Sequence, residues 1–190
     1  MEVAWDDWRT RQFATNVGLI SSDGPHGPNL MAAEWTRAVS YAPALIMLNI
    51  NARHATADNI IATKKFGVSW AAEDQNILAS VAGSSSGKQV DKVAALKEAG
   101  AEFYKGKTGV LLVKGAIMTA ECRVVRHEAL GDHIVFVGEV VELVADENKK
   151  PLIYHAGRYW KLGEAVRKPS PQEREKLEAI VLKHSKAKGE

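Results

Sequence analysis

The sequence lacks most of the features that would assign it to a specialised class of protein. Its 190 residues contain one cysteine, Cys122, so no disulfide can form within the chain, and we expect a reducing compartment and a buried structural thiol. No apolar run approaches the roughly 20 residues that a membrane-spanning helix requires. The 25 basic and 23 acidic residues nearly cancel, which argues against nucleic acid or an anionic membrane as a partner. These absences predict a cytoplasmic protein with small-molecule partners.

Several catalytic signatures are absent or incomplete. The six histidines never occur as H-x-H or H-E-x-x-H, so we expect no metal site. The segment Gly83–Gly87 formally matches a hydrolase nucleophile elbow, but helical rather than strand-like sequence precedes it. It is one residue too short for a P-loop, and Gln89 stands where Ser or Thr should hold magnesium. Hydrolase and NTPase functions are therefore disfavoured, and no dinucleotide-binding fingerprint is present.

Short apolar segments separated by turn residues dominate the chain. We predict strands near 16–22, 29–37, 44–50, 66–71, 110–128, 133–144, 152–155 and 158–162. The run at 44–50 is apolar enough for a strand covered on both faces. Helical spacing predicts helices near 54–64, 74–82 and 90–99, and a short helix or arm over 2–14 that carries Trp5, Trp8 and Phe13. Many strands with few helices predict a mainly β fold, an antiparallel barrel with peripheral helices.

The C-terminal segment has a different character. Ser170, Pro171 and Glu173 supply a capping hydroxyl, a proline at the first helical position and an acid at the third, which predicts a helix over 173–183. We expect one domain over 1–168, large enough for a single core, followed by a helical tail over 169–190.

Three segments offer groups suited to a phosphate and a flat ring. Asn29–Thr36 combines small residues with hydroxyls, so backbone could approach a ring, although a plain barrel strand would also explain it. In Asn51–Asn59, Arg53, Thr56 and a helix start form a candidate anion site, or else a solvated loop. Ser84–Lys88 offers hydroxyls, backbone N–H groups and a lysine, or else is a flexible polar loop.

These segments occur in the same order as in one known family. Together with Gly131-Asp-His133, Val137–Val140 and Pro151–Tyr159, they resemble the flavin reductase-like, FMN-binding split-barrel family, from about Asn16 to Leu162. The resemblance implies a Greek-key-like split barrel, bound FMN, NAD(P)H as reductant, a flavin or ferric acceptor and a homodimer with flavin at the interface. Glu34-Trp35 departs from the family, where a small residue and Phe are frequent.

The resemblance also implies which residues contact the flavin. The ring would lie against the backbone of Asn29–Thr36 and Leu48–Asn51, and the phosphate against Arg53, Thr56 and the serine loop. The candidate contacts are Asn29, Met31, Ala32, Ala33, Glu34, Trp35, Thr36, Leu48, Asn49, Ile50, Asn51, Arg53, His54, Thr56, Asn59, Ser84, Ser85, Ser86, Gly87, Lys88, Asp91, Lys92, Tyr154, Arg158 and Tyr159.

His133 is the candidate catalytic residue. The resemblance places it near the nicotinamide of the reductant, whereas its Gly-Asp-His context also suits simple turn chemistry. If it has no role in hydride transfer, the alternative is a non-enzymatic FMN-binding redox carrier or stress-related flavoprotein that a protein donor reduces. A flavin-free interaction module is the third possibility.

Overall fold

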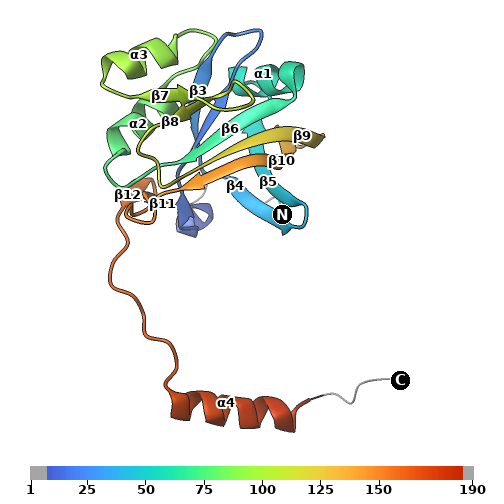
Figure 1. Ribbon diagram of the computed structural model, residues 1–190, viewed down its shortest axis with the longest axis vertical. Coiled ribbons are helices and arrows are strands. Elements are labelled where there is room, and N and C mark those ends of the chain that lie inside the picture. Colours follow the sequence, from blue (N-terminus) through green and yellow to red (C-terminus); the bar gives the residue numbers. More distant parts are fainter. Residues whose placement is uncertain (1–7, 186–190) are drawn as a thin grey trace.

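A strongly curled antiparallel sheet forms the centre of the computed structural model, which describes residues 8–185 (Figure 1). Its seven strands lie in the order β3-β2-β6-β9-β10-β5-β4. Their bounds are Gly18–Ser22 for β2, Asn29–Ala33 for β3, Thr36–Tyr41 for β4, Ala44–Asn51 for β5, Lys65–Trp70 for β6, Met118–Leu130 for β9 and His133–Ala145 for β10.

The chain itself requires the sheet to curl. The two edge strands, β3 and β4, are consecutive and are joined only by Glu34 and Trp35, so the two edges must come together. The Asn49 N–H donates to the Trp35 carbonyl at 3.1 Å and pins this junction to β5. Within residues 8–185 no strand ladder joins β3 to β4. The predicted antiparallel barrel with peripheral helices is confirmed, and its split lies at this seam.

Smaller elements surround the barrel. A 3-10 helix, η1 (Trp8–Gln12), leads into β1 (Thr15–Asn16), which pairs with β11 (Ile153–His155), and β11 pairs with β12 (Arg158–Trp160). A second hairpin consists of β7 (Phe103–Lys105) and β8 (Leu111–Val113). The helices are α1 (Ala55–Thr63), α2 (Asn76–Ser84), α3 (Lys92–Glu98) and α4 (Pro171–Lys183).

Apolar residues form two cores. Phe66, Leu48 and Phe136 belong to the barrel interior, where Cys122 is fully buried and burial raises the pKa of its thiol to about 12, as expected for a structural thiol. Leu30 and Leu96 belong to the second core, which includes residues of α2, α3 and β11. Because side chains alternate along a strand, β3 contributes to both cores and separates them.

Several predicted elements need correction. The expected strand at 110–128 is β8 followed by β9, because Gly115 (φ +74°) turns the chain between them, and β7 was not predicted. The expected strand at 29–37 is divided at Glu34-Trp35. The 44–50 strand is not covered on both faces, since buried and half-buried residues alternate along β5. Of the expected helix over 2–14, the described part is the short η1, and Trp5 lies outside the described residues.

The C-terminal helix stands apart from the barrel at the end of an extended segment (Figure 1). The expected capping box is present, with Ser170 accepting from the Glu173 N–H and the Glu173 carboxylate accepting from the Ser170 N–H. No residue of α4 is buried, and the division into a 1–168 domain and a 169–190 tail stays a prediction. Within residues 8–185, no helix has the length and apolar character needed to cross a bilayer.

A buried carboxylate fixes the β7–β8 loop to the barrel. Glu121, only 1% exposed, accepts from the Lys107 N–H (2.7 Å), the Thr108 N–H (2.6 Å) and the Thr108 hydroxyl (2.6 Å). Burial favours the neutral acid, but these hydrogen bonds outweigh it and hold the pKa of Glu121 below its usual range.

We expect Glu121→Gln to destabilise the fold by about 2 kcal/mol or more and to lower Tm by roughly 4 to 8 °C, because an amide places an N–H against these donors. Thermal unfolding measures this, with Glu139→Gln on exposed β10 as the charge-matched control. Since the folded pKa is depressed, the difference should be full above pH 4.5 and disappear below it. An unchanged Tm would contradict the anchoring role.

Candidate functional site

Three segments distant in sequence meet at the N-terminal end of β3. The Asn29 Nδ2 donates to the Thr56 hydroxyl at 2.8 Å, which joins β3 to the start of α1. Gly87 packs so closely on Asn29 that a Cβ at this position would overlap the amide. Asn29 is 3% exposed, and its Oδ1 has no hydrogen-bond donor among the described residues. A buried, unpaired acceptor is costly, so this atom suits a hydroxyl donor supplied by a ligand.

Positively charged side chains gather beside this junction. Burial and the positive charges of Lys92, His133, Arg53 and Lys88 lower the pKa of His54. His54 is therefore a neutral imidazole among cations. Lys88 pairs with Asp58 at 2.8 Å, and Asp58 also bonds His26 at 2.8 Å. The cations around His54 exceed the acids that hold them, which is the electrostatic character of an anion site.

Lys92 is the most unusual of these cations. It is 3% exposed, and its Nζ donates to the carbonyl of Ala82 in the last turn of α2 at 3.0 Å. Burial lowers its pKa to about 8. Lysines are seldom buried without an acid, so an incoming anion would provide the counter-charge that the fold leaves out.

A chain of hydrogen bonds connects His133 with Arg53. The Asp132 carboxylate bonds His133 Nδ1 at 2.7 Å and accepts from Asn51 Nδ2 at 2.9 Å. The Asn51 Oδ1 in turn accepts from the Arg53 backbone N–H at 3.1 Å and from Arg53 Nε at 3.3 Å. The His133 ring also lies on Trp35, with centroids 5.0 Å apart. These contacts fix the orientation of the imidazole.

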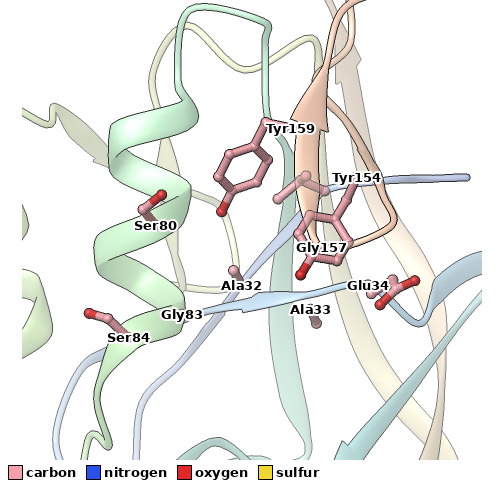
Figure 2. Close-up of a pocket in the computed structure, with 10 residues that line it drawn as sticks. Ala32, Ala33, Glu34, Ser80, Gly83, Ser84, Tyr154, Gly157 and Tyr159 are labelled. Carbon is pink, nitrogen blue, oxygen red and sulfur yellow. The ribbon is translucent and has the colours of Figure 1, made fainter. Parts of the chain in front are cut away.

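A cavity of about 470 Å³ lies at the other end of β3 (Figure 2). Ala32, Ala33 and Glu34 of β3 and its turn form one wall, and Ser80, Gly83 and Ser84 of α2 form another. Figure 2 shows the rings of Tyr154 and Tyr159 entering from the β11–β12 hairpin, and their centroids are 5.6 Å apart. Four strand steps separate Asn29 from Ala33, which is about 13 Å at roughly 3.3 Å per residue. The cation cluster and the cavity thus lie near the two ends of β3.

A second cavity of about 420 Å³ adjoins the first. Both are lined by Glu34, Tyr154 and Gly157, and the second also by Arg11, Trp35 and Ala156. The backbone N–H of Ala156 donates to the Arg11 carbonyl at 3.1 Å, which holds η1 against the β11–β12 turn. Burial raises the pKa of the Glu34 carboxyl above its usual value.

Some predicted contact residues have side chains in the barrel interior. Leu48 and Ile50 are buried in the inner core and Met31 packs against it, because alternate residues of a strand face inward. Thr36 lines a different cavity beside Ala38 and Tyr41, and its buried hydroxyl lies against Gly18. Side-chain contacts from these four residues are therefore withdrawn.

Other predicted contacts are already committed to the fold. The Asn59 amide accepts from the His26 N–H at 3.0 Å and donates to the Gly27 carbonyl at 2.9 Å, so it holds the β2–β3 turn. Asp91 caps α3 by accepting from the Ala94 N–H at 2.9 Å. Arg158 is exposed and lines neither of the two cavities that Glu34 lines. We withdraw these three as direct contacts.

The remaining predicted residues lie beside the cation cluster or the cavities. Ser85 follows α2, and the Ser86 hydroxyl accepts from the Lys88 N–H at 3.2 Å. Asn49 is half-buried next to the Trp35 junction. Sequence reasoning missed Ser80, although Ser80, Gly83 and Ser84 recur at helical spacing and could have been recognised as one face. It also missed Asp58, Arg11 and Gly157, whose places depend on contacts across the chain that no local pattern reveals.

Comparison with known proteins identifies the family. A family model described as "Flavin reductase like domain" matches residues 10–163. The chain belongs to this family. An NADH-dependent flavin reductase of Rhodococcus sp is 28% identical over 154 residues, 78% of this chain and 80% of the relative. The NADH-dependent FMN reductase AsuE2 of Streptomyces nodosus subsp. asukaensis is 29% identical over 146 residues, 76% of this chain and 77% of the relative.

Solved structures of the family share the fold. BorF, the flavin reductase component of a bacterial two-component tryptophan halogenase, superposes with a TM-score of 0.72 at 26% identity, over 83% of this chain and 96% of that one. The predicted family is therefore confirmed, and membership supports the prediction of an NAD(P)H:flavin oxidoreductase.

We expect Lys92→Met to have opposite effects on stability and ligand binding. At pH 7 the flavin-free variant should be more stable than wild type, because a buried charge is removed. Since the lysine pKa falls from 10.5 to about 8 on folding, that gain should shrink as pH rises from 8 to 10.5. Affinity for FMN should fall about tenfold or more, while riboflavin, which lacks the phosphate, should be little affected.

Chemical denaturation across this pH range and fluorescence titration with both flavins measure the two effects. Arg53→Ala is the matched comparison, since Arg53 is exposed: FMN affinity should fall with no change in stability. Equal losses of affinity for FMN and riboflavin would show that the substituted cation does not contact the phosphate.

Proposed function

We propose that this protein is an FMN-binding oxidoreductase that uses NAD(P)H to reduce flavin, or a ferric acceptor through flavin. The observation that carries the proposal is the pair of features at the two ends of β3, a cation cluster at one end and a cavity of about 470 Å³ at the other. A phosphate joined to a flat ring by a polyhydroxy chain matches both ends and the spacing between them. A cytoplasmic location is part of the proposal.

The residues present fit this cofactor. Arg53, Lys88 and Lys92 would hold the phosphate together with the first N–H groups of α1, whose N-cap His54 provides no side-chain cap. The unpaired Asn29 Oδ1 would accept from a hydroxyl of the ribityl chain. Ala32 and Ala33 line the cavity with small side chains, which would let a ring approach the backbone. Lys88 would exchange its ion pair with Asp58 for one with the phosphate, because the Asp58 carboxylate and the phosphate compete for its ammonium group.

When bound, the flavin supplies the redox chemistry, accepting a hydride and passing electrons on. The chain contributes binding and orientation, which for two reactants held in line supply much of the barrier reduction. Tyr154, Tyr159 and Trp35 line the cavities and would shield a bound ring from water. His133, held by Asp132 and packed against the Trp35 ring, would orient the nicotinamide rather than transfer a proton.

The proposal includes a homodimer. Tyr41 is fully exposed, and Val39, Leu143 and Val144 of β4 and β10 are each about half exposed or more (49%, 57% and 54%). An apolar face of this kind is typical of a protein interface. We expect sedimentation equilibrium to give twice the chain mass of 20.7 kDa, and Leu143→Glu to shift the protein toward monomer. A wild type that remains monomeric at micromolar concentration would contradict the dimer.

Anaerobic bleaching of FMN by NADH or NADPH tests the reductase assignment. His133→Ala should leave FMN affinity almost unchanged while slowing bleaching about tenfold or more, since misplacing the hydride donor is costly. Stopped-flow traces at limiting and saturating nucleotide separate binding from the chemical step. His127→Ala, on exposed β9, is the matched control and should bleach normally.

The outcomes separate the candidate functions. Wild-type protein that binds FMN but is bleached by neither nucleotide would reject the reductase in favour of the redox carrier. Protein that binds no FMN would reject both. An unaffected His133→Ala in an active enzyme would return His133 to a role in the β9–β10 turn.

A further inference from the structure

Glu34 occupies the junction of the two cavities. It lines both of them, and it belongs to the two-residue connection between β3 and β4 where the barrel is split. A ring held where the two cavities meet would therefore lie beside Glu34. The family resemblance places a small residue here more often, so this carboxyl is a particular feature of the present chain.

The carboxyl group has no partner that would neutralise it. Among the described residues, the Glu34 side chain makes neither an ion pair nor a hydrogen bond, although it is half-buried. The other ionisable groups that line the two cavities are Arg11, Tyr154 and Tyr159. Glu34 is thus the single acid facing this space within the described part of the chain. A partly desolvated carboxylate repels anions more strongly than one in bulk water.

The second cavity is shaped for a flat group. Trp35 and Tyr154 provide aromatic walls, while Ala156 and Gly157 form a tight turn with positive φ values (50° and 77°) and leave space above it. Aromatic walls favour planar rings by stacking. A volume of about 420 Å³ accommodates a ring of one or two cycles with its substituents.

We propose that Glu34 is a specificity-determining residue, which admits neutral planar rings bearing a hydrogen-bond donor to the second cavity and excludes anionic rings. A carboxamide would donate its N–H to the Glu34 carboxylate in a charge-assisted hydrogen bond. A ring carboxylate would meet like charge. The inference rests on the proposed function, because the carboxamide of a nicotinamide is the neutral group that this function would bring here.

Arg11 has the opposite effect to Glu34 on the charge of the ring that the cavity prefers. Arg11 lines the same cavity, and its guanidinium would attract a ring carboxylate, so the balance between Glu34 and Arg11 sets the charge preference. Removing the acid leaves Arg11 as the charged group of this cavity. Removing Arg11 leaves Glu34 unopposed. The two substitutions should therefore change the preference in opposite senses.

Nicotinamide and nicotinate test this, because they share one ring and differ in charge. Dissociation constants at pH 7.5 are measured by ligand-observed NMR titration on FMN-loaded and FMN-free protein. Wild type should prefer nicotinamide about tenfold, the effect of roughly 1.4 kcal/mol. Glu34→Gln should remove or invert the preference, and Arg11→Gln should increase it. Glu175→Gln, on the distant helix α4, should behave as wild type.

Glu34→Ala controls for an effect specific to the glutamine side chain, and it should also remove the preference for nicotinamide. Thermal unfolding confirms that each variant is folded. Equal preference in wild type and both Glu34 variants would overturn the inference, as would failure of wild type to bind either ring. If wild type is bleached by NADH but the preference does not depend on Glu34, only this inference fails. If the preference depends on Glu34 but no bleaching occurs, the reductase function fails and the selectivity of the cavity stands.

Discussion

The structure depends on one topological constraint, the placing of two consecutive strands at opposite edges of a single sheet. Because only Glu34 and Trp35 join β3 to β4, the sheet has to close on itself, and the seam falls at the point where the chain crosses from one edge to the other. An edge strand is ordinarily a liability, since its unpaired backbone groups seek partners. Here the edge strand β3 is covered by α2, and Ala32 and Ala33 at its C-terminal end line a cavity.

The cations near the N-terminal end of β3 have fewer acidic partners than their charge requires. Among residues 8–185 the buried Lys92 ammonium has a carbonyl as its one partner, and Lys88 shares its acid with His26. The surroundings of His54 lower the pKa of its imidazole. An arrangement of this kind is unfavourable for the empty protein and favourable once an anion is present. Binding and stability are therefore linked, and the ligand should contribute to the folding free energy of the chain.

Sequence reasoning recovered the parts that rest on local patterns. Ser170 with Glu173 defined a helix start, because a cap depends on a few neighbouring residues. The flavin-contact segments came from resemblance to a family and stay predictions. Met31, Leu48 and Ile50 of these segments face the barrel interior, since a segment match does not specify which of two alternating faces points to the ligand. The pairing of Asp58 with Lys88, and the cavity that Arg11 and Glu34 both line, bring together residues more than 20 positions apart, and only the folded chain reveals them.

The seam itself separates two properties that most barrel positions combine. A residue within a paired strand serves the ladder and the core at once, so its replacement disturbs the fold. Glu34 and Trp35 lie between strands, where Trp35 is 39% exposed and neither side chain belongs to a core cluster. Substitutions there can change the chemistry of the cavities while leaving the barrel intact. The chain thus carries a position at which new ligand preferences can be acquired by mutation, or introduced by design, without first compensating for lost stability.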